Sequence, residues 1–508
     1  MEIEYFLCGL MKVMFIKPPS ILPENWKGIY SITLPLGICY LGSMIKSDHE
    51  VVALDALIEG WKKVNEFTTP KGRKAKILGL SFDEIEYRIE KESPDIVGIT
   101  SLSVDAQSAY RVAEIAKIVN PNTNVVMGGS HATCAPNLVL GNPSIDYVVM
   151  GEGEYTIVEF LKALEDKKDM SKVKGIAWKK GNSIVINERR PLIAELDKLP
   201  FPDRSIFPVE EYFKVSKYMQ GTWQTPKRAL SIITSRGCPH NCQFCSVYNV
   251  TGKIWRPRSP ENVVDEIEML CDKYNVKRIV FEDDNLTLNR ERFFKICSLI
   301  KERKLDFDWN TPNGIRADSL DEELIKKMID AGCYELTLSV ESGSQRVLDD
   351  VIQKRLNLEK AIEGVKLCKK LGVKKVSCYF VYGNMEETKE EIQKTVNLVR
   401  KFRDMEVFCY CFIALPYYNS RLYNMSKEKG YLLAEDGEDL EIGVLNGKAL
   451  IKTPEFTPED IYSFQKQLGR EEIKASVQIA THNLPNFLRL LALHPKEVIK
   501  YGLSLVVK

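Results

Sequence analysis

Three cysteines lie within eight residues of one another at the end of an apolar run. Cys238, Cys242 and Cys245 follow the β-branched segment SIIT (231–234), which predicts a buried strand. Three thiolates on one loop can bind three irons of a four-iron cluster and leave the fourth iron open, whereas such clusters usually take four cysteines. A zinc site is the alternative, but zinc sites pair such cysteines with a second Cys/His pair downstream, and none follows here.

The CxxxCxxC spacing, with Phe244 before the last cysteine, resembles the signature of the radical S-adenosylmethionine (radical SAM) enzymes. The resemblance implies a [4Fe–4S] cluster on Cys238, Cys242 and Cys245, with SAM chelated to the open iron through its amino and carboxylate groups. It also implies that the backbone of Phe244 meets the adenine of SAM. A cluster of this kind needs a reducing or anaerobic setting.

The bulk properties are those of a globular protein with two or three domains. The 508 residues are too many for one core. A net charge of +1 predicts no global basic field for bulk nucleic acid, and no apolar run is long enough for a membrane span. The N-terminus lacks the features of a signal peptide. The thirteen cysteines show no disulfide framework, so we expect a cytoplasmic protein.

Apolar strands alternate with helices in the first third of the chain. Strands are predicted at 12–17, 51–54, 95–100, 124–127 and 146–150, and helices at 36–46, 85–92 and 106–119. This alternation predicts right-handed βαβ units in a doubly wound, Rossmann-like parallel sheet. Open sheets of this kind bind ligands at the carboxyl ends of their strands, and Gly, Ser or Pro follows each strand here.

This half resembles the cobalamin-binding domain of cobalamin-dependent radical SAM enzymes. The matching segments are PLGICYLGSMIK (35–46), SLS (101–103), GGSHAT (128–133) and VVMGEGE (148–154). The resemblance implies that small residues make room for the displaced tail of the cofactor, with contacts from Ser101, Leu102, Ser103, Gly128, Gly129, His131, Gly151 and Glu152. A generic doubly wound domain is the alternative reading.

The loop after the first predicted strand, residues 17–20, departs from one cobalamin-binding pattern. It lacks the D-x-H-x-x-G motif that supplies an axial histidine to cobalt in methionine-synthase-like proteins. We therefore expect tail-displaced cobalamin without a histidine ligand. His131 stands in the GG-x-H turn, where a structural or tail-contacting role is expected rather than cobalt ligation.

A second series of strands and helices follows a connector and predicts a partial (β/α)6 barrel. A hairpin is expected at 175–186, with Gly181-Asn182 at its turn, and a proline-rich crossing at 199–203. The expected domains are 1–165 (cobalamin-binding), 166–225 (connector), 226–425 (radical SAM barrel) and 426–508 (mostly helical). Residues 422–508 are expected to be mostly helical and include the amphipathic segments 487–493 and 498–507. We expect this region to form a helical cap on the barrel rather than a membrane-surface helix.

Polar residues gather at the carboxyl ends of the predicted barrel strands, where such barrels place their chemistry. The resemblance implies that SAM is contacted by Phe244, Asp283, Asn285, Asn313, Ser339, Glu341, Tyr379 and Gly383. It implies catalytic roles for Asp284, Arg316 and Glu341, with Arg316 paired to the SAM carboxylate or to Glu341. The carboxylates at 283 and 284 have a plain alternative as helix N-caps.

The combined resemblance implies a cobalamin-dependent radical SAM methyltransferase. A 5′-deoxyadenosyl radical would abstract hydrogen from an unactivated carbon, methylcobalamin would supply the methyl group, and a second SAM would restore it. The expected partners are a one-electron reductant of the flavodoxin or ferredoxin type and a substrate that is a peptide, a protein or a small molecule. The alternatives are cyclisation, rearrangement or oxidation without methyl transfer, and a radical SAM enzyme whose N-terminal domain binds no corrinoid.

Overall fold

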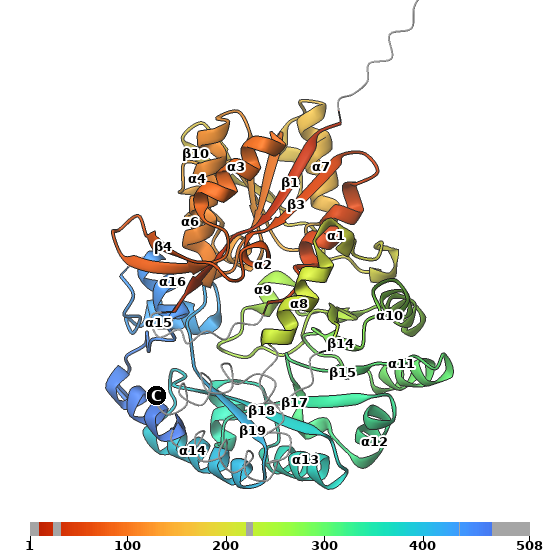
Figure 1. Ribbon diagram of the computed structural model, residues 1–508. Helices are drawn as coiled ribbons and strands as arrows, with labels where there is room; N and C mark the ends of the chain where they lie inside the picture. The colour runs from red at the N-terminus through yellow and green to blue at the C-terminus, as the bar shows by residue number, and fades with distance from the viewer. Residues whose placement is uncertain (1–9, 24–31, 220–226, 436, 470–508) are drawn as a thin grey trace, which may run out of the picture.

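The computed structural model describes residues 10–23, 32–219, 227–435 and 437–469 (Figure 1). The N-terminal part forms a seven-stranded sheet in the order β10-β9-β8-β7-β6-β1-β3. Five strands of this sheet, β1, β3, β6, β7 and β8, pair in parallel, as predicted, and β9 and β10 are added antiparallel. The strands are β1 (Lys12–Lys17), β3 (Glu50–Asp55), β6 (Ile96–Thr100), β7 (Asn124–Gly128), β8 (Tyr147–Val149), β9 (Ile176–Lys180) and β10 (Ser183–Ile186).

Helices cover both faces of this sheet, and its inner strands are therefore continuous apolar runs. The predicted helices are present, and α3 begins at a capping box formed by Ser81 and Glu84. The helices of this domain are α1 (Leu36–Ile45), α2 (Ala56–Glu59), α3 (Phe82–Glu92), α4 (Ala106–Val119), α5 (Ser130–Cys134), α6 (Pro136–Leu140) and α7 (Glu154–Glu165).

Two features of this region differ from the prediction. The hairpin β9–β10 was expected inside the connector, but β9 pairs with β8 and so extends the N-terminal sheet. A small antiparallel sheet of β2 (Ser20–Leu22), β5 (Lys74–Leu78) and β4 (Val64–Thr68) was not predicted. Its strands alternate weakly between buried and exposed residues, which explains why the pattern alone does not reveal them.

The second half forms the predicted partial barrel, below the N-terminal sheet in Figure 1. Its strands pair in parallel in the order β11-β14-β15-β17-β18-β19, and β16 pairs with β17. The strands are β11 (Ala229–Ile232), β14 (Arg278–Phe281), β15 (Asp308–Asn310), β16 (Ile315–Arg316), β17 (Cys333–Glu341), β18 (Lys375–Tyr382) and β19 (Phe408–Ile413).

The barrel helices lie between these strands along the chain. Ser259 caps the first long one, α10, whose first residue is a proline. The helices are α10 (Pro260–Tyr274), α11 (Arg290–Glu302), α12 (Glu322–Asp330), α13 (Leu358–Lys370) and α14 (Lys389–Asp404). The connector contributes α8 (Val209–Met219), and the cysteine loop contains α9 (Val247–Val250) between two short strands, β12 (Ser235–Arg236) and β13 (Arg256–Pro257).

The C-terminal region contains helices and irregular segments where it is described, and it does not pack on the barrel alone. It includes α15 (Arg421–Glu428) and α16 (Gly437–Leu445). α16 lies against the N-terminal domain, where the Gln107 side-chain amide donates to Glu441 (2.6 Å) and the Thr69 hydroxyl donates to Glu438 (2.6 Å). The expected position of this region as a cap on the barrel is therefore wrong for α16. The amphipathic segments 487–493 and 498–507 lie outside the described residues.

Within the described ranges, no helix combines the length and apolar composition required to cross a membrane.

Candidate active site

The loop that carries the three cysteines is held by backbone contacts on several sides. Gly237 has φ of +86°, and a Cβ atom there would lie 2.3 Å from the carbonyl oxygen of Ile254, so the turn into the loop requires glycine. The amide of Cys238 donates to the carbonyl of Gly252 (3.2 Å). The amide of Gln243 donates to the carbonyl of Ile352 (2.9 Å). The loop is thus anchored both to itself and to the segment after β17.

The three cysteines are free thiols of intermediate exposure. Burial raises the pKa of Cys238, and it raises the pKa values of Cys242 and Cys245 to about 11 and about 12. The cations Lys354 and Arg316 act in the opposite direction on Cys242 and favour its thiolate. Three free thiols on one anchored loop, with cations beside them, are a donor set that fits an iron–sulfur cluster. Among the described residues, no three His, Cys, Asp or Glu side chains could hold a single metal ion.

Two predicted carboxylates follow β14 and bind the ends of the cysteine loop. Asp283 is buried and accepts hydrogen bonds from the amide and the hydroxyl of Thr234 (3.1 and 2.7 Å). Asp284 accepts from the hydroxyl of Thr251 (3.0 Å). Burial raises the pKa of both carboxyls. Asp283 therefore anchors the strand that leads into the loop, and neither residue serves as the N-cap of α11, which is Asn289.

Two predicted amides lie beside these carboxylates. Against the larger effect of burial, Asn285 acts to lower the pKa of the Cys238 thiol, and the side chain of Asn313 donates to the carbonyl of Glu282 (2.8 Å). Glu282 itself was not predicted as a site residue. Burial raises the pKa of its carboxyl to about 7, with Asp283 acting in the same direction.

Glu341 ends β17 and has a buried cationic partner. Its φ of +72° is unusual for a residue with a side chain, and a register shift precedes it on β17. The Lys354 ammonium lies 2.6 Å from its carboxylate. Arg316 instead pairs with Asp318 (2.8 Å) and donates to the carbonyl of Lys354 (2.9 Å). The predicted pairing of Arg316 with Glu341 is therefore wrong, because Lys354 occupies that position.

Ser339 and Tyr379 are register partners on β17 and β18, so their side chains share one face of the sheet. The carbonyl of Ser339 accepts from Lys354 (3.0 Å), which places it next to the Glu341 ion pair. The Tyr379 hydroxyl donates to the carbonyl of Pro312 (2.5 Å), in the loop after β15. These two predicted SAM contacts are therefore close to the strand ends that carry Arg316 and Glu341.

The other two predicted SAM residues, Phe244 and Gly383, are held in place by contacts with segments outside the barrel strands. Phe244 lies against the buried cluster Val347, Val351 and Ile352. The amide of Gly383 donates to Glu387 (2.8 Å), and a Cβ atom at Gly383 would lie 2.9 Å from the side chain of Ile461. The position of Gly383 is thus set by a contact with the C-terminal region.

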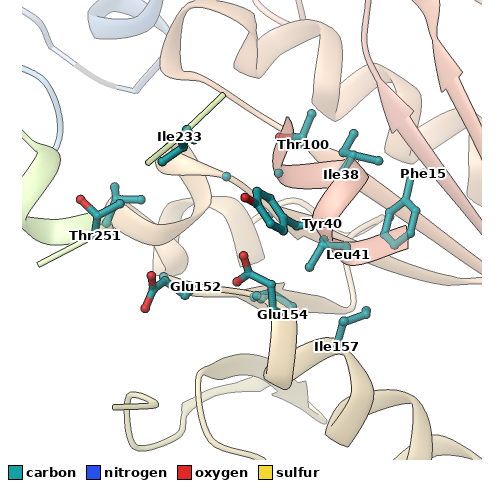
Figure 2. Close-up of a pocket in the computed structure, with 18 of the residues that line it drawn as sticks. Phe15, Ile38, Tyr40, Leu41, Thr100, Glu152, Glu154, Ile157, Ile233 and Thr251 are labelled. Carbon is teal, nitrogen blue, oxygen red and sulfur yellow. The ribbon is translucent and has the colours of Figure 1, made fainter. Parts of the chain in front are cut away.

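A cavity of about 280 Å³ lies where the carboxyl ends of both sheets meet (Figure 2). Its walls come from the ends of β6, β7 and β8, from α1 and α7, and from the barrel side of the cysteine loop. Four predicted cobalamin residues line it, namely Gly128, Gly129, Gly151 and Glu152, and so does the predicted catalytic residue Asp284. The cavity therefore connects the two halves of the predicted site.

The glycines of this cavity leave the space that a flat ring system would need. A Cβ atom at Gly37 or at Gly128 would meet no protein atom within 4 Å, so a side chain there would stand in open space. At Gly151 the nearest atom would be 3.8 Å away. The remaining walls are largely apolar, with the aromatic ring of Phe15 and aliphatic side chains such as Ile38, Leu41 and Ile157. Residues of this kind fit the displaced tail of cobalamin.

The other predicted cobalamin residues are not among those that line the cavity. Leu102 is exposed, and Ser101 is buried and hydrogen-bonds the carbonyl of Gly128. His131 is 1% exposed, with Nδ1 3.2 Å from the Ser103 hydroxyl and Nε2 2.8 Å from the Tyr110 hydroxyl. Burial lowers the pKa of His131 to about 4, which leaves it neutral at pH 7. His131 is thus held by two side-chain contacts, and its expected contact with the tail of cobalamin stays a prediction.

Several residues of the site carry no local sequence signal. Lys354 pairs with Glu341 across a turn, and Tyr40, Arg236 and Glu154 line the cavity from three separate segments. The sequence offered three hints, because Tyr40 belongs to the segment PLGICYLGSMIK, Glu154 belongs to VVMGEGE, and Arg236 lies just before the cysteine loop. Their convergence depends on how the two domains pack.

Comparison with protein families matches both halves of the chain. Residues 28–161 match the B12 binding domain, and residues 232–399 match the radical SAM superfamily. An uncharacterized methyltransferase of Pyrococcus horikoshii is 34% identical over 426 residues, which cover 84% of this chain and 85% of that protein. The chain belongs to the cobalamin-dependent radical SAM enzymes.

Other relatives of this cobalamin-dependent radical SAM enzyme are named for more than one reaction. Cytidylyl-2-hydroxyethylphosphonate methyltransferase of Streptomyces wedmorensis is 30% identical over 458 residues (84% of this chain, 83% of that protein). Anaerobic magnesium-protoporphyrin IX monomethyl ester cyclase of Rubrivivax gelatinosus is 30% identical over 353 residues (68% and 61%). The family therefore includes proteins named for methyl transfer and for cyclisation.

Solved structures share the fold of this cobalamin-dependent radical SAM enzyme. The enzyme OxsB with aqua-cobalamin bound matches with a TM-score of 0.68 and 18% identity, over 95% of this chain and 72% of that one. The methyltransferase TsrM of Kitasatospora setae matches with a TM-score of 0.62 and 16% identity, over 82% and 76%. The predicted α/β architecture, with a B12-binding domain before a radical SAM barrel, is confirmed.

Proposed function

We propose that this enzyme transfers a methyl group to an unactivated carbon of a peptide or protein side chain or of a small molecule. The observation that carries the proposal is the shared cavity, because Gly128 and Gly151 of the B12-binding domain and Thr251 and Asp284 of the barrel side line one space. When bound, the [4Fe–4S] cluster and SAM supply a 5′-deoxyadenosyl radical, and cobalamin supplies the methyl group. A substrate carbon held at this junction would be within reach of both.

The chain's own residues have binding and orienting roles in this proposal. Cys238, Cys242 and Cys245 would hold the cluster, and Asp283 keeps their loop in place from the barrel side. The buried pair of Glu341 and Lys354 lies at the strand ends where we propose that SAM binds. SAM ends in one ammonium and one carboxylate, and a carboxylate and an ammonium side chain held at one place suit recognition of that zwitterionic end.

The cobalamin pocket is proposed to take the tail of the cofactor in its displaced form, without a histidine ligand to cobalt. Support comes from the open space at Gly37 and Gly128 and from the position of His131, whose two ring nitrogens already contact Ser103 and Tyr110. A one-electron reductant of the flavodoxin or ferredoxin type is the proposed redox partner, in a reducing cytoplasm.

A second candidate function is cyclisation, rearrangement or oxidation without net methyl transfer. The Rubrivivax gelatinosus relative named a cyclase favours it.

Product analysis separates these two functions. The reconstituted enzyme is incubated anaerobically with SAM that carries a deuterated methyl group and with extract of the source cells, and the matched control is Cys242→Ala. Methyl transfer predicts a labelled product together with S-adenosylhomocysteine and 5′-deoxyadenosine in equal amounts. Formation of 5′-deoxyadenosine with a changed but unlabelled product, and no S-adenosylhomocysteine, would contradict methyl transfer and support the second function.

A further inference from the structure

Two arginines stand directly opposite each other at the base of the cysteine loop. β12 and β13 pair antiparallel, and Arg236 is the register partner of Arg256. Both are buried, at 9% and 5% exposure. Like charges at directly opposed positions destabilise a strand pair, and burial makes the repulsion stronger. The base of the loop therefore needs negative charge from elsewhere in order to close.

The B12-binding domain provides that charge through two glutamates. Glu152 bridges both arginines, at 3.0 Å from Arg236 and 2.7 Å from Arg256. Glu154 lies 2.6 Å from Arg236, on the other side of the same guanidinium. Although burial opposes the charged form, Glu154 and Glu152 raise the pKa of Arg236. Two positive and two negative groups thus form a neutral, buried quartet between the domains.

The same quartet forms part of the cavity wall. Glu152, Glu154 and Arg236 all line the cavity, and Figure 2 shows the carboxylate of Glu154 beside Tyr40. The ring of Tyr40 lies 5.1 Å from the Arg236 guanidinium. Any ligand that fills the cavity is therefore in contact with groups that close the base of the cysteine loop.

We propose that Glu152 and Glu154 are positioning residues for the iron–sulfur loop, and that this quartet couples cobalamin binding to assembly of the cluster. Cobalamin in the cavity would hold the two carboxylates in place, and the carboxylates would hold Arg236 and Arg256 at the base of the loop. The coupling is reciprocal by thermodynamic necessity, so a bound cluster must tighten cobalamin binding by the same factor. The proposal rests on the cofactors of the enzyme and not on methyl transfer.

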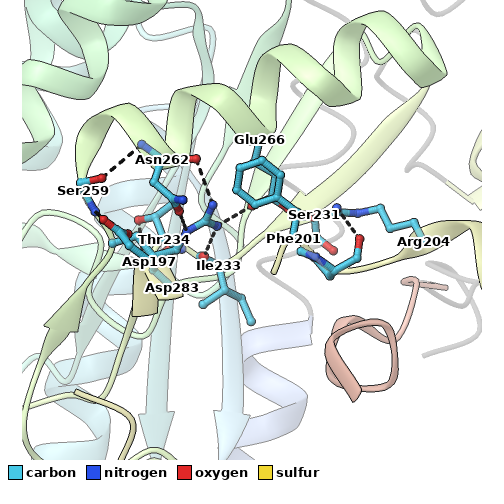
Figure 3. A network of polar contacts seen from close by, with 12 residues as sticks. Asp197, Phe201, Arg204, Ser231, Ile233, Thr234, Ser259, Asn262, Glu266 and Asp283 are labelled. Atoms are coloured by element: carbon cyan, nitrogen blue, oxygen red, sulfur yellow. Dashed lines mark hydrogen bonds and ion pairs between the residues drawn. The ribbon is translucent and has the colours of Figure 1, made fainter. Parts of the chain in front are cut away.

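A second buried triad offers a matched control. Glu266 lies between Arg204 (2.7 Å) and Arg258, and its side chain is buried and paired with two arginines, as that of Glu152 is (Figure 3). Glu266, however, joins α10 to the connector and does not line the cavity. Glu266→Gln therefore removes a carboxylate charge from between two arginines at a residue that does not line the cavity.

The test is a binding measurement that requires no substrate. The dissociation constant of hydroxocobalamin is measured by visible absorbance for the full chain with its cluster reconstituted and for the full chain without iron. For the wild type we expect cobalamin to bind about tenfold more tightly when the cluster is present. In Glu152→Gln the ratio of the two constants should fall to about one, and in Glu266→Gln it should keep the wild-type value.

Three results would overturn the proposal. A Glu152→Gln protein that keeps the wild-type ratio would show that the quartet does not carry the coupling. A ratio of one in the wild type excludes the coupling without any variant, so a Glu152→Gln protein that fails to fold does not leave the proposal untested. A ratio that falls equally in Glu152→Gln and Glu266→Gln would show that general loosening of the fold, and not the quartet, carries the effect. Because methylated product is not measured, failure here is distinct from failure of the proposed function.

Discussion

Gly128 and Gly129 are adjacent, yet a substitution at Gly128 should weaken cobalamin binding and one at Gly129 should destabilise the fold. Gly128 ends β7, its φ is compatible with any residue, and a Cβ atom there would meet nothing within 4 Å. Gly129 has φ of +94°, and its Cβ would lie 2.6 Å from the carbonyl oxygen of Ser101. A side chain at Gly128 would thus enter the cavity, and one at Gly129 would collide with backbone.

Gly128→Val should weaken cobalamin binding without destabilising the cobalamin-free protein. A valine in an empty, apolar space removes apolar surface from water, at about 0.8 kcal/mol per buried carbon, and valine suits a strand. With cobalamin present, the same side chain overfills the cavity, which costs about 1–3 kcal/mol. At about 1.4 kcal/mol per tenfold change, the dissociation constant should rise by about 5-fold to about 150-fold.

Gly129→Ala should instead destabilise the protein with or without cobalamin. A residue with a side chain at this positive φ costs about 1–3 kcal/mol, and the contact with Ser101 forces the backbone to move. The assays are a hydroxocobalamin titration followed by visible absorbance and thermal melting of the cobalamin-free variants. If Gly128→Val binds hydroxocobalamin with wild-type affinity, the cofactor does not enter this cavity. If the melting temperature of Gly128→Val falls as far as that of Gly129→Ala, a side chain at position 128 collides with the protein and does not enter open space.

Three further predictions concern the barrel. Cys242→Ala should lose the cluster and the formation of 5′-deoxyadenosine, and it should bind cobalamin about tenfold more weakly, as the cluster-free wild type does. Iron analysis and visible absorbance are the two readouts, and complete loss of cobalamin binding would contradict this expectation. Lys354→Met leaves Glu341 buried without its cation, which costs about 3–5 kcal/mol of stability. The melting temperature and the affinity for SAM, measured by equilibrium dialysis, should therefore both fall. Lys354→Arg keeps a cation and should retain much of both. Glu282 has a pKa raised by burial to about 7, above about 4.3 in the unfolded chain; its contribution to stability is therefore complete below pH 4.3 and is lost as the pH rises through 7. Between pH 5 and 8 the melting temperature should therefore fall less steeply in Glu282→Gln than in the wild type. Parallel curves of melting temperature against pH for the two proteins would contradict this expectation.

The strands of both sheets could be predicted because each is marked by its own residues. Parallel strands covered on both faces are continuous apolar runs, and KVMFIK (12–17) and KVSCYFVY (375–382) show that pattern. The small sheet of β2, β5 and β4 shows no such pattern, since its order depends on pairing between distant segments. The position of α16 could not be predicted for the same reason, because Glu441 finds its partner Gln107 in the other domain.

The candidate site was predictable where it is local and missed where it is not. Cys238, Cys242 and Cys245 are recognised from their spacing, and the glycines of the cavity from the turns they occupy. Lys354 follows an irregular helical turn at Val347–Val351, with nothing in its neighbours to connect it with Glu341. Arg316 was the more obvious cation by position, but its local partner Asp318 already satisfies it.

The buried quartet also limits how far the two domains can act as independent units. In an isolated B12-binding domain, Glu152 and Glu154 would lose Arg236 and Arg256, and the cavity would lose the wall formed by Thr251 and Asp284. In an isolated barrel, two arginines would oppose each other at the base of the cysteine loop without a counter-charge. Each half thus supplies charges that the other requires, and the cobalamin pocket and the cysteine loop are better understood as two sides of one site.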